Sequence, residues 1–173
     1  MIALIGRSGS GKSTIQKELE KKGYKKVVMA TTRPKREGEV DGEDYYFLSE
    51  EEWLLKAKNK IFVDSACYNK WYYGLEIPKD NEKAVVCVTP AGFRCLKRNG
   101  YNVISVYIDV DRRIALIKSL ERGDIIEEAY RRNVSDVGQF DRVEEEVDIV
   151  IKNDFNTPVE ILAERVLNSI KEL

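Results

Sequence analysis

The chain has 173 residues, of which 43% are hydrophobic and 34% are charged, as is typical of soluble globular enzymes. Its 29 basic and 30 acidic residues give a net charge of −1, which argues against a cationic surface for nucleic acid or membranes. Histidine is absent, so Ser-His and Cys-His catalysis and most zinc sites are excluded. We expect a single cytoplasmic domain, because there is no long apolar segment or signal peptide and the three cysteines lack metal-ligand spacing. They are Cys67, Cys87 and Cys95.

The first predicted strand, Ile2–Ile5, leads directly into a glycine-rich segment that precedes a helical pattern. This segment fits G-x-x-x-x-G-K-[ST] and reads Gly6-Arg7-Ser8-Gly9-Ser10-Gly11-Lys12-Ser13-Thr14. Its glycines allow a tight turn whose N–H groups converge on phosphate oxygens, and the helix adds its positive N-terminal end. Lys12 is expected to neutralise the β and γ phosphates, and Ser13 to ligate Mg²⁺. A glycine-rich turn that matches by chance is disfavoured by the flanking strand and helix, so the segment predicts nucleoside triphosphate binding.

Four further apolar runs have the pattern of buried parallel strands. They are Val27–Ala30, Ala84–Val88, Val103–Ile108 and Val147–Ile151. Helical patterns lie between and after these runs. Such alternation predicts an α/β fold, a three-layer domain with a parallel central sheet.

Capping signals place two helices in the middle of the chain. Thr89-Pro90 opens a helix that stops near Asn99-Gly100, and Asp111 opens another that runs to Glu121. The apolar side of the second helix carries Ile114, Ile117 and Leu120.

Two more helices are predicted further along. A capping box of Asp124 with Glu127 opens the first, and Thr157-Pro158 opens the second. The apolar face of the first carries Ile126, Tyr130, Val134 and Val137. The second is expected to pack on the sheet through Val159, Leu162, Val166, Ile170 and Leu173.

The segment from Thr31 to about Asp80 interrupts the alternation and is rich in aromatic residues. Its short strand-like pieces surround one helix, which is capped by Ser49 with Glu52. We interpret it as an inserted α+β subdomain that covers the phosphate loop from one side.

Within this insert, Arg33 and Arg36 lie three residues apart around a proline, so that both guanidinium groups can converge on one anion. Tyr45 and Tyr73 can donate phenolic O–H groups to the same oxygens. The alternative of a solvated loop whose arginines pair with neighbouring acids, with core-packed tyrosines, stays open. The acids are Glu37, Glu39 and Glu43.

Several of these motifs, in this order and with similar gaps, resemble the guanylate kinase family. They are Gly6–Thr14, the run from Thr31-Thr32-Arg33 through Gly38-Glu39-Val40-Asp41-Gly42 to Tyr45, then Tyr72-Tyr73-Gly74, and Asp148–Asp154. The resemblance covers essentially the whole chain and implies transfer of the terminal phosphate of ATP to GMP with Mg²⁺. It also implies three parts of one P-loop kinase domain. These are a core of residues 1–32, 83–111 and 144–173, a monophosphate-binding insert of 33–82, and a small helical lid at about 112–143.

The resemblance assigns roles to particular residues. ATP is assigned to the phosphate loop and Asn153, and the acceptor phosphate to Arg33, Arg36, Tyr45 and Tyr73. The transferring phosphoryl group is assigned to the lid arginines Arg122, Arg131 and Arg132. These cations, with Lys12 and Arg33, suit a reaction in which charge stabilisation supplies most of the acceleration. The lid arginines have an alternative as exposed helix charges paired with Glu121, Glu127 or Glu128.

The chain departs from the family at the residues that read the acceptor base. Asp64 replaces a glutamate, Leu75 replaces a serine, and the strand that ends in two acids in the family here reads Val86-Cys87-Val88-Thr89. Asp64, Leu75 and Thr89 form the expected base-reading set, although a helix cap is the favoured role for Thr89. Since the usual Mg²⁺-supporting acid is missing, Asp109 is an alternative, as a metal partner or as a cap.

Two other functions stay open. One is a related kinase with another acceptor, such as a different nucleotide or a phosphorylated sugar. The other is a non-catalytic guanylate-kinase-like interaction module, which the intact phosphate loop disfavours. Small-molecule nucleotides are the expected partners, without nucleic acid or membrane, and the sequence does not separate a monomer from a homodimer.

Overall fold

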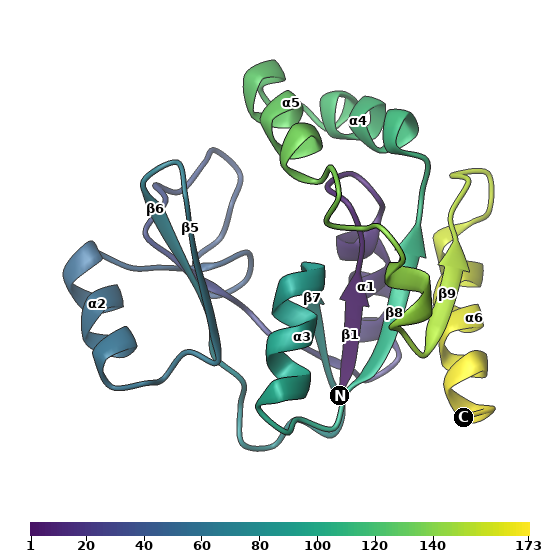
Figure 1. The fold of residues 1–173 in the computed structure, drawn as a ribbon, viewed down its shortest axis with the longest axis horizontal. Coiled ribbons are helices and arrows are strands. Elements are labelled where there is room, and N and C mark those ends of the chain that lie inside the picture. The colour runs from purple at the N-terminus through teal and green to yellow at the C-terminus, as the bar shows by residue number, and fades with distance from the viewer.

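A computed structural model describes all 173 residues, and its centre is a sheet of five parallel strands (Figure 1). In spatial order the strands are β2 (Lys25–Lys26), β7 (Ala84–Val88), β1 (Ile2–Ile5), β8 (Ile104–Asp109) and β9 (Ile149–Lys152). All four residues of β1 are buried, as expected for a central strand covered on both faces. The predicted parallel sheet is confirmed, and the ends of β8 and β9 differ by one or two residues from the prediction.

Helices cover both faces of this sheet. One face carries α1 (Lys12–Lys21) and α6 (Val159–Lys171), and the other carries α3 (Pro90–Arg98). Alternate residues of β1 therefore enter different cores: Leu4 packs with Ile15 and Leu162, whereas Ile5 packs on the side of Phe93. This arrangement confirms the three-layer α/β fold.

A second, mixed sheet lies beside the first (Figure 1). In order it contains β4 (Tyr46–Phe47), β3 (Ala30–Thr31), β6 (Trp71–Leu75) and β5 (Asp64–Tyr68). The helix α2 (Glu50–Lys58) packs on it through Trp53, whose ring stacks 5.1 Å from Phe62 and 4.7 Å from Tyr72 between ring centroids. The capping box of Ser49 with Glu52 is present as predicted.

Beyond the carboxyl ends of the parallel strands lie α4 (Arg112–Glu121) and α5 (Ile126–Ser135), and a short 3-10 helix, η1 (Val143–Glu145), follows them (Figure 1). Two predicted caps are confirmed: Thr89 accepts from the Gly92 amide at 3.1 Å, and Asp111 accepts from the Arg113 amide at 2.8 Å. None of the helices combines the length and apolar content that a bilayer crossing needs.

The predicted strand Val27–Ala30 is wrong. Its flanks pair in different sheets, Lys25–Lys26 with β7 and Ala30–Thr31 with β4 and β6. The apolar run therefore bridges two sheets, and its local pattern resembles that of one continuous strand.

The predicted start of α5 is also wrong. The N-cap is Ile125, without a side-chain hydrogen bond, because the Asp124 carboxylate pairs with Arg122 and Arg132. The apolar faces predicted for α4 and α5 are exposed, since both helices lie beyond the end of the sheet. Exposed are Ile114, Ile117, Leu120, Ile126, Tyr130, Val134 and Val137, and at the end of the chain Leu173.

Ser105 of β8 is hydrogen-bonded to Asp148, the residue directly before the edge strand β9. It is completely buried, and its amide and hydroxyl donate to Asp148 Oδ2 at 2.7 and 2.5 Å. The Asp148 amide returns a bond of 3.0 Å to Ser105 Oγ. This pair precedes β9 and so helps set where the turn after β9 lies.

Replacement of Ser105 by alanine removes the buried hydroxyl that donates to Asp148 Oδ2 and accepts from the Asp148 amide. We expect Ser105→Ala to lower the free energy of unfolding by about 1–3 kcal/mol, as measured by urea denaturation. The matched control is Ser65→Ala on β5, where the serine is exposed. Equal stability of the two variants would contradict the role assigned to this pair.

Candidate functional site

The phosphate loop joins the central strand β1 to α1 through two residues in the left-handed region. Gly9 has φ 78° and Gly11, the N-cap of α1, has φ 89°. A Cβ atom on Gly9 would stand 2.1 Å from the Ala115 carbonyl oxygen of α4. Glycine is therefore required here both by backbone conformation and by the approach of α4.

Lys12 lies against this loop. Its Nζ donates to the Gly6 and Arg7 carbonyl oxygens, both at 2.7 Å. Burial lowers the pKa of the Lys12 ammonium, and the positive charges of Arg122 and Arg132 lower it further. Lys12 thus places an ammonium group at the phosphate loop, and the nearest partners of that group are carbonyl oxygens.

The turn after β9 closes one side of the loop. Asn153 is 7% exposed, and its Nδ2 donates to the Ser10 carbonyl oxygen at 3.0 Å while its Oδ1 accepts from the Phe155 amide at 3.0 Å. Asn153 therefore lies at the phosphate loop, through a contact with the loop backbone.

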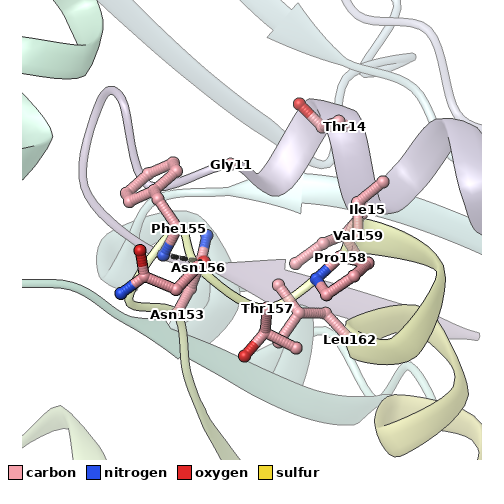
Figure 2. Close-up of a pocket in the computed structure, with 10 residues that line it drawn as sticks. All are labelled: Gly11, Thr14, Ile15, Asn153, Phe155, Asn156, Thr157, Pro158, Val159 and Leu162. Carbon is pink, nitrogen blue, oxygen red and sulfur yellow. Dashed lines mark hydrogen bonds between the residues drawn. The ribbon is translucent and has the colours of Figure 1, made fainter.

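A cavity of about 320 Å³ opens beside Gly11, between the start of α1 and the start of α6 (Figure 2). Its lining residues are Gly11, Thr14, Ile15, Asn153, Phe155, Asn156, Thr157, Pro158, Val159 and Leu162. Sequence reasoning missed all of those after Asn153. The only signal in the sequence was the neighbouring Asn-Asp turn. Phe155 has a left-handed backbone with φ 61°, a conformation that its residue type does not predict.

The residues near the loop fit a metal ion shared with a nucleotide rather than a protein-bound metal. The Ser13 side chain is exposed on the first turn of α1, and nowhere do three His, Cys, Asp or Glu side chains gather as a metal-binding group. At the end of β7, burial raises the pKa of the Cys87 thiol to about 11, so it offers no thiolate. Asp111, not Asp109, caps α4. Mg²⁺ commonly binds one or two protein groups together with substrate phosphates, and Ser13 suits that mode.

In the insert, Arg33 is held in a buried ion pair. It is 4% exposed, its Nη2 lies 2.6 Å from Glu39 Oε1, and its Nη1 donates to the Pro34 carbonyl oxygen at 2.8 Å. Burial opposes the charge of Arg33, but the Glu39 carboxylate outweighs it and raises the pKa of the guanidinium. The predicted alternative of acid pairing therefore holds for Arg33. Arg36 is exposed, and its amide donates to the second Glu39 oxygen at 2.8 Å.

Two predicted tyrosines lie next to this ion pair. The Arg33 Cζ atom is 5.4 Å from the centre of the Tyr45 ring, and the rings of Tyr45 and Tyr73 meet edge to face at 6.1 Å. Burial raises the pKa of the Tyr45 hydroxyl, which keeps it protonated as a donor. The structure thus brings Arg33, Tyr45 and Tyr73 together.

The lid arginines are also paired with acids. Arg131 and Arg132 donate to Glu128 at 2.9 and 2.8 Å, and Arg122 pairs with Asp124. The pairing with Glu128 matches the alternative weighed from the sequence, whereas Asp124 was not foreseen as a partner. Arg131 also stands 6.0 Å from the Tyr68 ring, so α5 reaches the insert.

A family model for guanylate kinase matches residues 1–169. The chain belongs to the guanylate kinase family. It is 31% identical over 163 residues to a guanylate kinase of Symbiobacterium thermophilum, covering 89% of this chain and 77% of the relative. It is 32% identical over 172 residues to a guanylate kinase of Helicobacter pylori, with 94% and 84% covered.

Solved structures support the fold. A guanylate kinase from Anaplasma phagocytophilum aligns with a TM-score of 0.70 and 23% identity over 99% of this chain and 84% of that one. A shikimate kinase from Acinetobacter baumannii, solved with shikimate, aligns with a TM-score of 0.55 and 13% identity over 99% and 92%. The fold is thus that of a P-loop kinase.

Among the expected base-reading residues of this guanylate kinase family member, Leu75 is a correction. It has no exposed surface and packs in the core on the side of Phe93, because the alternation of β6 turns it inward. It therefore does not reach an acceptor in this structure. Asp64 remains half-buried, with Oδ2 2.9 Å from where a Cβ of Gly92 would stand, and Thr89 has the cap role favoured from the sequence.

The Glu128 cluster makes a prediction for acid stability. Hydrogen bonds from Arg131, together with the charge of Arg132, lower the pKa of Glu128 from 4.5 to about 2. A lowered folded-state pKa stabilises the fold fully above the unfolded value and less as the pH falls. We expect the unfolding free energy of the wild type to decrease between about pH 4.5 and 2, and Glu128→Gln to reduce this dependence. Urea denaturation across that range measures it.

Glu127→Gln is the matched control, because Glu127 is exposed on the same turn. Its pH dependence should equal that of the wild type. A Glu128→Gln variant with unchanged pH dependence would show that the cluster does not stabilise the folded state.

Proposed function

We propose that this chain is an ATP:GMP phosphotransferase that converts GMP or dGMP and ATP to GDP or dGDP and ADP. The observation that carries the proposal is the placement of two cationic sites, Lys12 on the phosphate loop and Arg33 with two tyrosines in the insert. Arg131 of the proposed lid stands near the Tyr68 ring of the insert. Family membership supports the same reaction.

At the donor site, the loop amides and the positive end of α1 are proposed to hold the phosphates of ATP. Lys12 exchanges its two carbonyl contacts for phosphate oxygens and stabilises the charge that develops on the transferred group. The cavity next to Gly11 and Asn153 suits the nucleoside end of ATP.

At the acceptor site, Arg33, Arg36, Tyr45 and Tyr73 are proposed to bind the monophosphate. Arg33 and the tyrosines are already assembled, whereas Arg36 is exposed and has to turn toward the anion. Asp64 is the proposed partner of the N1–H and N2–H donors of guanine. These proposed contacts position the acceptor oxygen before the chemical step.

The lid is proposed to supply Arg122, Arg131 and Arg132 to the transferring phosphoryl group. Each must exchange Asp124 or Glu128 for phosphate oxygens. Closure would also exclude water as a competing acceptor. The proposed division of the domain is a core of 1–32, 83–111 and 144–173, an insert of 33–82 and a lid of about 112–143.

Mg²⁺ is proposed as the metal partner of ATP, with Ser13 as its protein ligand. When bound, such an ion would offset negative charge on the ATP phosphates. We further propose that the protein acts in the cytoplasm on small-molecule nucleotides, without nucleic acid or membrane partners. Both a monomer and a homodimer are compatible with this proposal.

A related kinase with another acceptor is the second candidate. The burial of Leu75 favours this candidate. Asp64 then remains as the residue for binding guanine, where the family has a serine and a glutamate. An interaction module is disfavoured by the complete phosphate loop.

The two candidates are separated by measuring ADP formation with a panel of acceptors: GMP, dGMP, AMP, CMP, UMP and ribose 5-phosphate. The proposal expects the highest kcat/KM with GMP or dGMP. A higher value with another acceptor would favour the second candidate, and poor ATP binding would favour the interaction module.

Removal of the Lys12 charge tests the donor site. We expect Lys12→Ala to lower kcat by about 100-fold or more while the protein keeps its circular dichroism spectrum. Lys17→Ala is the control, because Lys17 is exposed further along α1. Full activity of the Lys12 variant would remove the phosphate loop from the mechanism.

Removal of free divalent metal tests the proposed Mg²⁺ requirement. Excess EDTA should abolish transfer, and added Mg²⁺ should restore it, because the negative charge of the triphosphate then lacks the cation that offsets it during transfer. Turnover that continues undiminished in EDTA would refute the requirement.

A further inference from the structure

The hairpin of β5 and β6 presents its tip to the lid helix α5. Tyr68 pairs with Trp71 across the hairpin, and the two residues between them, Asn69 and Lys70, have φ angles of 50° and 67°. Positive φ at both positions is the geometry of a tight two-residue turn that matches the twist of the flanking strands. The tip is therefore a short turn whose direction is fixed by the two strands.

Two neighbouring residues of this tip contact one ion pair of the lid. Asn69 Nδ2 donates to Glu128 Oε2 at 3.3 Å, and the Arg131 Cζ stands over the Tyr68 ring, 6.0 Å from its centre. Arg131 donates two hydrogen bonds to the Glu128 carboxylate, both of 2.9 Å. The insert therefore touches both members of the pair, one by a hydrogen bond and the other by an aromatic ring.

Tyr68 also connects the lid to the tyrosines proposed for the acceptor phosphate. Its ring meets that of Tyr73 edge to face, with 5.9 Å between the ring centroids and 62° between the planes. The two are diagonal neighbours on one face of the hairpin. Tyr73 in turn contacts Tyr45, whose ring lies beside the Arg33 guanidinium. An unbroken row of side chains therefore runs from Arg33 in the insert to Arg131 in the lid.

A contact with a ring face leaves the hydrogen-bonding edge of a guanidinium group free. The group is planar with its N–H donors in the plane, so an aromatic side chain can hold it while phosphate oxygens bind the donors. Glu128, in contrast, occupies those donors and has to release them when phosphate binds. Asn69 then remains as a partner of the Glu128 carboxylate. Of the two partners of Arg131, only Tyr68 can stay in place during transfer.

We propose that Tyr68 is a positioning residue for the lid, which docks α5 on the insert and holds the Arg131 guanidinium beside the acceptor site during phosphoryl transfer. Asn69 supports this docking through Glu128. The inference rests on the proposed function, because it takes Arg131 as one of the cations that stabilise the transferred group.

The first test is the steady-state kinetics of ADP formation with ATP and GMP. Tyr68→Ala should lower kcat by about 5-fold, the factor expected for loss of a cation–π contact, and leave KM for ATP unchanged. Tyr68→Phe keeps the ring face and should restore kcat to within about 2-fold of the wild type. Tyr46→Ala is the matched control, because Tyr46 is an exposed tyrosine of the same sheet, and its kinetics should equal those of the wild type.

A double-mutant cycle decides whether Tyr68 acts through Arg131. In an Arg131→Ala background, Tyr68→Ala should lower kcat by less than about 2-fold, because the group that it positions is already missing. A loss as large as that in the wild-type background means that Tyr68 acts by another route, and it overturns the inference. So does an unchanged kcat in Tyr68→Ala, or an equal loss in Tyr68→Phe.

Hydrogen exchange without nucleotide tests the docking itself. The α5 amides should exchange faster in Tyr68→Ala and in Asn69→Gly than in the wild type, because the lid loses contacts with the insert. Asn69→Gly removes the side-chain amide but tolerates the positive φ of the turn. Exchange in Tyr46→Ala should equal that of the wild type. Unchanged exchange in both tip variants overturns the inference.

Failure of this inference is distinguishable from failure of the proposed function, because the exchange measurement needs no substrate. If the wild type phosphorylates GMP but the tip variants match it in kinetics and exchange, only this inference fails. If exchange responds as expected but no monophosphate is phosphorylated, the proposed function fails and the docking of α5 by the hairpin stands.

Discussion

The close approach of α4 to the phosphate loop is the contact on which the rest of the site depends. Only a residue without Cβ at Gly9 lets the Ala115 carbonyl come so near. This packing sets α4, and with it α5, beyond the carboxyl ends of the parallel strands. The loop follows β1, the central strand. The loop, the turn after β9 and the lid helices therefore all meet at the carboxyl end of the sheet.

The cationic side chains of the site have partners within the protein. Arg33 is held by Glu39, the lid arginines by Glu128 and Asp124, and Lys12 by loop carbonyls. Such pairing keeps the guanidinium groups ordered and near their proposed targets, because a buried or half-buried cation without a partner is costly. Under the proposed function, substrate phosphates must replace these partners, which links binding to rearrangement. In this proposal the acidic side chains of the site have to release the cations before these bind phosphate.

The lid differs from the core in how it is stabilised. The core buries alternate strand residues under α1, α3 and α6, whereas α4 and α5 leave most of their apolar side chains exposed and are joined by polar contacts. The reciprocal bonds between Arg112 and Asn133 are an example. A segment with few buried apolar contacts opens at lower free energy than the core, which suits the closure proposed for it.

The sequence by itself determined the parallel sheet, the phosphate loop and most helix caps, because apolar runs, glycine spacing and capping residues act over a few neighbouring positions. Its residue patterns also named Arg33, Arg36, Tyr45 and Tyr73 of the insert as candidates. Only the tertiary structure decided that Val27–Ala30 bridges two sheets, that Leu75 faces the core, and that Asp124 serves arginines instead of capping α5. It also decided which acid pairs with Arg33 and that the Asp136 carbonyl oxygen accepts a hydrogen bond from Arg7. These features depend on contacts between segments far apart in the chain, and local periodicity carries no information about them.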